Sequence, residues 1–274
     1  MKLLFIGDIV GRPGRDILHK GLAPIVEAHD IDFVIANVEN AAAGFGITPD
    51  IAKTILEWGV QVMTTGNHVW DKKEVLDYIT KEPRLLRPAN YPAGVPGRGS
   101  IVAQTGDGRA VGVINVMGRV FMTDIDDPFA IARREIEAMR GRAQVIFVDM
   151  HGEATSEKMA MGWHLDGLVT AVVGTHTHVQ TADERLLPKG TAYLTDVGMT
   201  GPHDSIIGMA VEPSVSRFLT GMPSRFEPAT GNPRLNGVII EADDRTGRAV
   251  RISRISYGEQ DLHELALRSP VRRP

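Results

Sequence analysis

The chain has 274 residues, 43% of them hydrophobic and 23% charged, a composition that supports a substantial buried core and excludes a disordered chain. The net charge of -4 gives no strong nucleic-acid signal, and the lack of cysteine excludes disulfides, thiolate nucleophiles and cysteine-ligated metals. No apolar run approaches transmembrane length, so we expect no membrane association and a cytoplasmic location.

The first part of the chain alternates short apolar runs with helical patterns. Strands are predicted at Leu3–Ile6, Phe33–Val38 and Val60–Met63. Helices are predicted from about Arg15 to His29, from a start at Thr48-Pro49-Asp50, and over Lys72–Ile79. This βαβα order predicts an α/β fold with a parallel sheet.

The second part adds hairpins. A Pro- and Gly-rich stretch, Arg87 to Gly99, predicts a surface loop. Hairpins are predicted for Ser100–Gln104 with Val111–Val116 and for Val238–Ala242 with Ala249–Ile255. Between them we expect helices at Pro128–Met139 and Ala154–Leu165 and strands at Gln144–Asp149 and Leu168–Val173. The hairpins indicate added antiparallel strands, and the lack of a repeat or linker predicts one domain over residues 1–274.

Polar side chains follow five predicted strands at the point where each strand ends. They are Asp8, Glu39 with Asn40, Asn67 with His68, His151, and His176 with His178. Because open α/β sheets bind ligands outside the carboxyl ends of their strands, we expect these side chains to converge. Chance placement is the competing interpretation, and it leaves the three histidines His151, His176 and His178 hard to explain.

Individual residues also have ordinary structural explanations. Asp8 could cap the next helix, although the start expected at Arg15 makes a direct cap less natural. Asn40 and Asn67 could be turn residues, and His151 could be a packed core histidine.

Glu39 and the last two histidines favour a metal site. Glu39 ends an apolar run, where an unpaired carboxylate is costly and a metal pair would be a suitable partner. His176 and His178 stand two residues apart, so extended backbone would point both side chains the same way. The remaining histidines are assigned to packing or solvent: His19 and His29, which we expect to face solvent from the first helix, and His164, His203 and His263. A Gly-rich loop, Val197–Pro202, could bring His203 to the border of the site.

The oxygen and nitrogen donor set, without sulfur, suits iron, manganese or zinc. The candidates exceed what one tetrahedral zinc needs, whereas two ions that share a bridging carboxylate would use them all. Glu39 is the best candidate for the bridge because a carboxylate has two oxygens. Such an ion pair can hold a hydroxide and clamp a phosphoryl group.

These motifs resemble those of the calcineurin-like metallophosphoesterases. They are Gly7-Asp8, Gly66-Asn67-His68, the lone His151 and Gly174-Thr175-His176-Thr177-His178. The common Asp-x-His pattern is broken by Val10, and Glu39 replaces the usual bridging aspartate. Both departures are typical of the YmdB-type 2′,3′-cyclic-nucleotide 2′-phosphodiesterases, which the sequence resembles over nearly its whole length.

The resemblance implies a four-layer α/β/β/α sandwich and a centre of two metal ions, iron first and manganese as the alternative. One ion would be held by Asp8, Glu39, Asn40 and His178, and the other by Glu39, Asn67, His151 and His176. Asn40 would take the place of the histidine missing at Val10. A metal-bound hydroxide would attack a 2′,3′-cyclic nucleotide, and His68 would protonate the leaving 2′-oxygen to give the 3′-nucleotide.

A dinucleotide-binding interpretation competes with this one. Gly7, Gly11 and Gly14 lie between a strand and a helix, but the Gly-x-Gly-x-x-Gly fingerprint would need glycine at position 9, which is Ile9. Asp8 would also repel a pyrophosphate.

Two further alternatives concern function alone. The protein could act on another phosphodiester or on a phosphomonoester. It could also be a metal-stabilised regulatory or RNA-binding protein, with Arg84, Arg87 and Arg98 as a small basic patch. We expect a small-molecule phosphodiester as the main partner, and a homo-oligomer remains possible.

Overall fold

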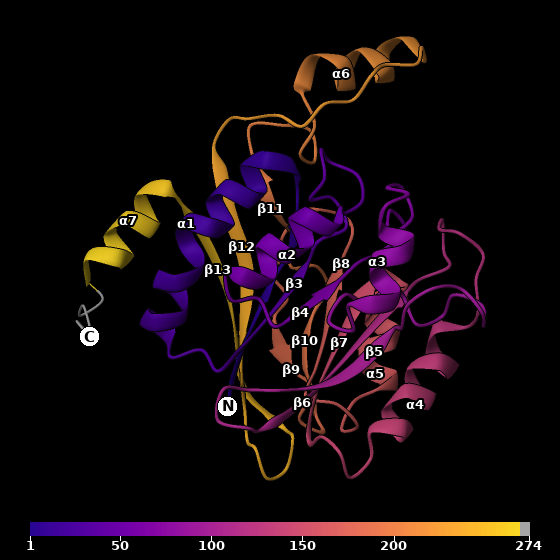
Figure 1. Cartoon of the computed structure of the whole chain (residues 1–274), viewed down its shortest axis with the longest axis vertical. Coiled ribbons are helices and arrows are strands. Elements are labelled where there is room, and N and C mark those ends of the chain that lie inside the picture. Colours follow the sequence, from indigo (N-terminus) through magenta and orange to yellow (C-terminus); the bar gives the residue numbers. More distant parts are fainter. Residues whose placement is uncertain (269–274) are drawn as a thin grey trace.

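A computed structural model describes residues 1–268 and contains two sheets with helices on their outer faces (Figure 1). The strands of the first sheet are β1 (Lys2–Ile6), β2 (Asp8–Ile9), β3 (Phe33–Asn37), β4 (Val62–Thr64), β11 (Met199–Pro202), β12 (Pro233–Ala242) and β13 (Ala249–Gly258). Those of the second are β5 (Ser100–Gln104), β6 (Ala110–Met117), β7 (Val145–His151), β8 (Ala171–Thr175), β9 (Arg185–Leu186) and β10 (Ala192–Leu194). The helices are α1 (Gly11–His29), α2 (Pro49–Glu57), α3 (Val75–Lys81), α4 (Pro128–Met139), α5 (Thr155–His164), α6 (Val211–Thr220) and α7 (Glu259–Arg268).

Both sheets contain a run of neighbouring parallel strands. The first sheet has the order β2-β11-β12-β1-β3-β4, with β13 paired to β12, and β1, β3 and β4 run parallel. The second has the order β5-β6-β7-β8-β10-β9, with β6, β7, β8 and β10 parallel. Both predicted hairpins are confirmed, because β5 pairs antiparallel with β6 and β12 with β13. Parallel pairing brings the carboxyl ends of neighbouring strands to one edge, where ligand sites form.

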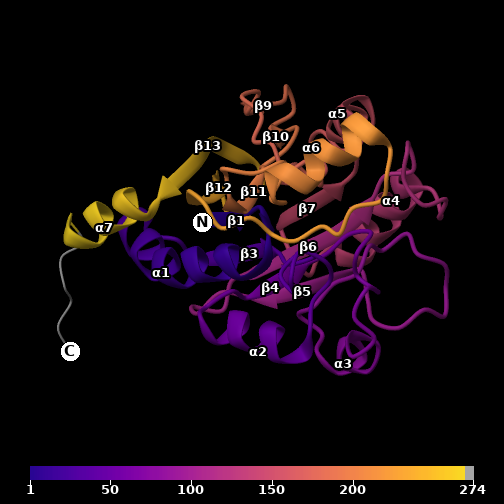
Figure 2. The same cartoon turned by 90° about the horizontal axis from the view of Figure 1, so that it is seen from above.

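Three apolar cores separate the layers. The middle core lies between the sheets, where Phe5 of β1 and Phe147 of β7 place their ring centroids 4.7 Å apart. A second core joins the first sheet to α1, α2, α3 and α7, and a third joins the second sheet to α4 and α5. Figure 2 shows α1, α2 and α3 on the opposite side of the molecule from α4 and α5. The predicted four-layer α/β/β/α sandwich is therefore confirmed.

Some predicted boundaries were wrong. Helix α1 begins at Gly11 instead of Arg15, because the Gly14 N–H already donates to the Val10 carbonyl at 3.0 Å. The expected surface loop is partly buried. The Arg87 Nε donates to the Pro96 carbonyl at 3.0 Å, and residues 87–90 are all buried. Arg87 is therefore not available to the small basic patch that was considered with Arg84 and Arg98.

Several elements had no sequence prediction, namely β2, β9, β10, β11, α6 and α7. Helix α6 stands away from the sheets on two chain segments (Figure 1). These segments bond to each other, with Ala210 N donating to the Glu227 carbonyl and Ala229 N to the Gly208 carbonyl, each at 2.9 Å. Among residues 1–268, no helix has the length and apolar character needed to cross a membrane.

The middle core generates a stability prediction. We expect Phe147→Ala to lower the free energy of unfolding by about 3–5 kcal/mol, because it removes a fully buried ring and leaves a cavity between the sheets. Urea denaturation followed by circular dichroism measures this change. The matched control is Phe218→Ala on α6, whose side chain is 84% exposed. Equal stability of the two variants would contradict the assigned core.

Candidate metal centre

The side chains predicted from the strand ends converge in the structure. Asp8 lies in β2 directly after β1, Glu39 and Asn40 follow β3, and Asn67 and His68 follow β4. In the second sheet, His151 ends β7, while His176 and His178 follow β8. Residues that lie 168 positions apart thus come within bonding distance, as the His176 N–H donates to Asp8 Oδ2 at 3.3 Å.

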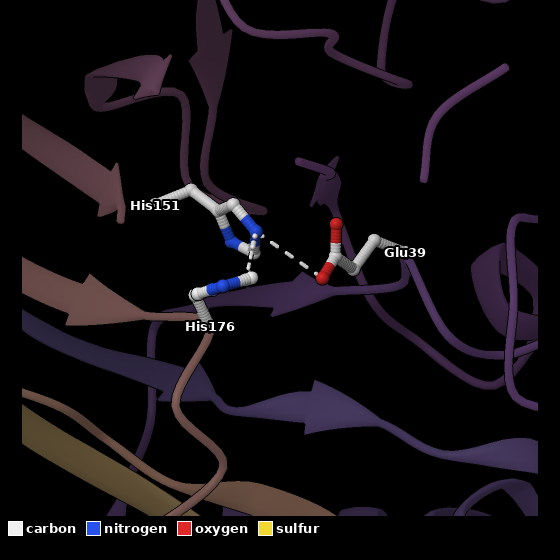
Figure 3. Close-up of side chains that lie close together, drawn as sticks. All are labelled: Glu39, His151 and His176. Carbon is white, nitrogen blue, oxygen red and sulfur yellow. Dashed lines mark hydrogen bonds and ion pairs between the residues drawn. The ribbon is translucent and has the colours of Figure 1, made fainter. Parts of the chain in front are cut away.

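One donor group forms around His151. Figure 3 shows Glu39, His151 and His176 pointing toward one another. The His151 Nε2 lies 3.2 Å from Glu39 Oε1, 3.1 Å from His176 Nδ1 and 3.0 Å from Asn67 Oδ1. Three of these residues, Glu39, His151 and His176, place donor atoms within 4.8 Å of one another, as a metal site requires.

A second donor group shares Glu39 with the first. Asp8, Glu39 and His178, all buried, also place donor atoms within 4.8 Å of one another. Asn40 joins this group, because its Oδ1 lies 3.3 Å from His178 Nε2 while its Nδ2 donates to the Gly44 carbonyl. The carboxylate of Glu39 therefore lies between two potential cation positions.

Hydrogen bonds determine which nitrogen of His151 faces the centre. Thr175 donates its single hydroxyl proton to Asp149 Oδ1 at 2.6 Å. The same hydroxyl must then accept from His151 Nδ1, which lies 2.9 Å away. A neutral His151 consequently carries its proton on Nδ1 and directs the lone pair of Nε2 at Glu39, as a metal ligand should.

The other two histidines are oriented in the same manner. The Nδ1 of His178 donates to the Ile207 carbonyl at 2.8 Å, so its Nε2 lone pair faces Asn40 Oδ1. The Nε2 of His176 lies 3.1 Å from Glu153 Oε2, so its Nδ1 lone pair faces His151.

The backbone between these histidines corrects an expectation. His176 and His178 have φ of 97° and 65°, so the segment is not extended and the side chains do not point the same way. Left-handed backbone is unfavourable for histidine and persists only when the surroundings hold it. As a result, His176 joins the first donor group and His178 the second.

A buried ion pair holds this strained segment. Asp196 Oδ2 accepts from the backbone N–H and the hydroxyl of Thr177, at 3.1 and 2.8 Å. Lys158 of α5 donates to the same oxygen at 2.6 Å, and both charged side chains are almost fully buried. Removing either partner would leave an uncompensated buried charge, so the pair fixes the loop that carries the two histidines.

The residues present fit a pair of cations. With the three histidines neutral and their protons placed as above, lone pairs of nitrogen and oxygen face one another at hydrogen-bond distance, an arrangement that a cation would reconcile. Within residues 1–268, Asp8 Oδ1 is buried without a hydrogen-bond partner, as expected of an atom reserved for a ligand. Gly66 leaves the space open, because a Cβ there would overlap His151 and Glu39.

Electrostatics in the cluster favour added positive charge. Burial raises the pKa of Asp8 well above its usual value. Burial also acts to raise the pKa of Glu39, but the His151 charge and hydrogen bond outweigh it and bring the pKa to about 2. For His151, burial acts to lower the pKa, but the negative charges of Glu39, Asp8 and Asp149 outweigh burial and raise the pKa to about 9. Bound cations would supply the positive charge that a proton on His151 provides.

His68 lies beside this cluster, at the edge of the cleft. Its backbone N–H is 3.3 Å from Glu39 Oε2, and its Nδ1 is 2.8 Å from Asp71 Oδ2. The Phe45 ring packs edge-on against it, with centroids 5.1 Å apart. This arrangement leaves Nε2 of His68 without the Asp71 contact and able to exchange a proton.

Sequence reasoning missed the supporting residues of the centre. They are Asp71, Asp149, Glu153, Lys158, Thr175 and Asp196. Thr175 and Asp149 lie within two residues of predicted ligands, which is a local signal. Lys158 carried none, since an exposed and a buried helix lysine look alike in sequence.

The other histidines lie outside the cluster. His19 stacks on Trp58 and is otherwise exposed, and His164 packs edge-on against Phe129. His29 was expected to face solvent but is half-buried and 2.9 Å from the Tyr257 hydroxyl. His203 bonds to the Gly201 carbonyl and lines a separate cleft behind His178.

Comparisons with known proteins agree with this geometry. The chain is 51% identical to the 2′,3′-cyclic-nucleotide 2′-phosphodiesterase of Bacillus subtilis over 262 residues, covering 96% of this chain and 99% of that protein. A hypothetical protein from Thermus thermophilus has a crystal structure with a TM-score of 0.86 and 44% identity, covering 94% of this chain and 100% of that one.

A phosphatase from Mycoplasma pneumoniae has a TM-score of 0.88 at 34% identity, and the match covers 96% of each chain. The model of one family, described as YmdB-like protein, matches residues 4–255. From its donor residues, its fold and this match, the chain belongs to the YmdB-like protein family.

Proposed function

We propose that the protein is a metal-dependent phosphodiesterase that hydrolyses 2′,3′-cyclic nucleotides to 3′-nucleotides. The observation that carries this proposal is the pair of donor groups sharing Glu39 at the floor of a cleft of about 450 Å³. The activity named for the Bacillus subtilis relative supports the choice of substrate. We also propose that residues 1–274 form one domain that works in the cytoplasm.

Two ions would occupy the centre, with Glu39 as the bridge. Asp8, Asn40 and His178 would complete one set of ligands, and the other would be completed by Asn67, His151 and His176. Iron is the first choice and manganese the second, because carboxylate, amide and imidazole donors suit both. When bound, the ions supply positive charge that activates water and offsets charge on the phosphoryl oxygens.

His68 would donate a proton to the leaving 2′-oxygen. In hydrolysis a water oxygen bonds to phosphorus, the bond from phosphorus to the 2′-oxygen breaks, and that oxygen takes a proton. His68 lies at the cleft with Nε2 available, and Asp71 accepts from its Nδ1 and orients the ring. The 3′-phosphate remains as product.

The substrate assignment is tested with the wild-type protein. Loaded with Fe²⁺ or Mn²⁺, it should hydrolyse 2′,3′-cyclic AMP, and ³¹P NMR should identify the product as the 3′-phosphate. A phosphomonoester and a synthetic phosphodiester complete the set of substrates. Turnover of the synthetic diester with no turnover of any cyclic nucleotide would sink the assignment.

The proton donor generates a kinetic prediction. We expect His68→Ala to lower kcat on 2′,3′-cyclic AMP by about 10²–10⁴-fold while the metal content, measured by mass spectrometry, stays at the wild-type level. Asp71→Asn should lower kcat less, because the imidazole remains. Loss of bound metal from His68→Ala would instead identify His68 as a ligand. A binding protein with incidental catalysis would keep its biological effect in this variant.

The orientation of His151 generates a binding prediction. Thr175→Val removes the acceptor of the His151 Nδ1–H, so the ring can rotate or adopt the other tautomer. We expect Mn²⁺ affinity to fall about 10–100-fold, as measured by calorimetric titration of chelator-treated protein. Thr175→Ser keeps the hydroxyl and should bind like the wild type. Unchanged affinity in the valine variant would refute the role of this hydroxyl.

Metal removal generates a third prediction. Treatment with a chelator should abolish turnover, and Fe²⁺ or Mn²⁺ should restore it, whereas Ca²⁺ should not because it prefers all-oxygen ligands. The Glu39→Gln variant should fail to recover with any ion, since an amide bridges two cations poorly. Full activity in the treated protein, with metal absent by mass spectrometry, would exclude the proposed centre.

A further inference from the structure

One wall of the cleft supplies no side chain to the centre described above. The polar floor is formed by metal-site residues and His68, but the wall opposite is apolar. It is formed by Phe45, Ile206, Ile207, Met209, Phe218 and Phe226. All but Phe45 belong to residues 206–229, here called the α6 arm. Figure 2 looks down on α6, which lies over the edge of the molecule shown at the top in Figure 1.

The base of the α6 arm is fixed to the body of the protein. Gly44, which precedes Phe45, lies so close that a Cβ there would come within 2.9 Å of Met209 and 3.3 Å of Pro228. Bridge pairing of Met209 with Pro228 joins the two segments that lead into and out of α6. The base of the arm, from which the aromatic residues of α6 and residue 226 project, is therefore fixed beside the cleft.

Helix α6 presents two faces with different surroundings. Ser214 and Phe218, one helical turn apart, both line the cleft. Val211, Val215 and Leu219 form a separate stripe that does not line it. Phe218 is 84% exposed and Leu219 is 81% exposed, but only Phe218 lines the cleft that contains the donor groups.

The Phe226 ring is oriented so that one of its faces can stack on a ligand. The guanidinium of Arg217 lies 5.1 Å from its centroid, which fixes the ring by a cation–π contact. Aromatic side chains beside a polar floor suit a ligand with a phosphate at one end and a flat apolar ring at the other. A nucleobase joined through ribose to a cyclic phosphate has this form.

We propose that the α6 arm, through Phe218 and Phe226 together with Phe45, forms a stacking subsite for the nucleobase of the substrate. This proposal rests on the proposed function and adds the residues that select a nucleoside over a simple diester. Among the described arm residues lining the cleft, Ser214 has the only polar side chain, and it donates to the Ala210 carbonyl. The subsite therefore stacks on a base without reading its edge, so all four bases should be accepted.

The test compares Phe218→Ala with Leu219→Ala, its exposed neighbour outside the cleft. Substrates are the four 2′,3′-cyclic nucleotides and methyl riboside 2′,3′-cyclic phosphate, which has no base. We expect Phe218→Ala to raise KM about tenfold for every nucleotide, with little change in kcat. Its kinetics on the base-free substrate should equal those of the wild type. Leu219→Ala should behave as wild type throughout, and Phe218→Tyr should preserve stacking.

Several outcomes would overturn the subsite. Unchanged KM for the nucleotides in Phe218→Ala would do so, as would an equal rise on the base-free substrate. An equal defect in Leu219→Ala, with a lower sedimentation coefficient in both variants, would assign α6 to contact between copies of the chain. Strong preference of the wild type for one base would exclude stacking alone. If wild-type protein hydrolyses no cyclic nucleotide, the proposed function fails with it, a result distinguishable because it appears before any substitution.

Discussion

The structure depends on negative charge buried where strands end. Asp8 and Glu39 have almost no exposed surface, and a neutral His151, with its proton on Nδ1, turns a lone pair toward Glu39 Oε1. Buried carboxylates in such surroundings are costly unless positive charge joins them. Two cations would meet that need, and the membership of Glu39 in both donor groups explains why a pair suits the site better than a single ion.

Outside the donor atoms, hydrogen bonds determine how the histidines are presented. Asp149 fixes the tautomer of His151 through the Thr175 hydroxyl. Asp196, paired with Lys158, holds the left-handed segment that directs His176 and His178 to different donor groups. These groups contact no reacting atom in the proposed reaction. They restrict the conformations of the side chains that would contact reacting atoms, so the site is organised before substrate binds.

The sequence predicted the layers and the convergence of the strand-end side chains, because both follow simple periodic rules. Apolar runs mark strands, and parallel strands bring their last residues to one edge, so Asp8 and His151 could be placed together without coordinates. Other features depend on tertiary contacts. The divergence of His176 from His178 needs positive φ that Asp196 stabilises from a distance. Short strands such as β11, and the exposed α6 with Pro213 in its first turn, carry too weak a local pattern.

The position of β12 has a consequence for synthesis of the chain. This late strand lies between β1 and β13, and its pairing joins Lys2 to Glu241 and Ile6 to Gly237. Strand β1, which leads to Asp8, therefore cannot complete its pairing until β12 leaves the ribosome, more than two hundred residues later. Long-range contacts of this kind slow folding. Although β12 contributes no donor atom, a nascent chain that ends before it would hold Asp8 on an incomplete sheet, so metal capture should come late in biogenesis.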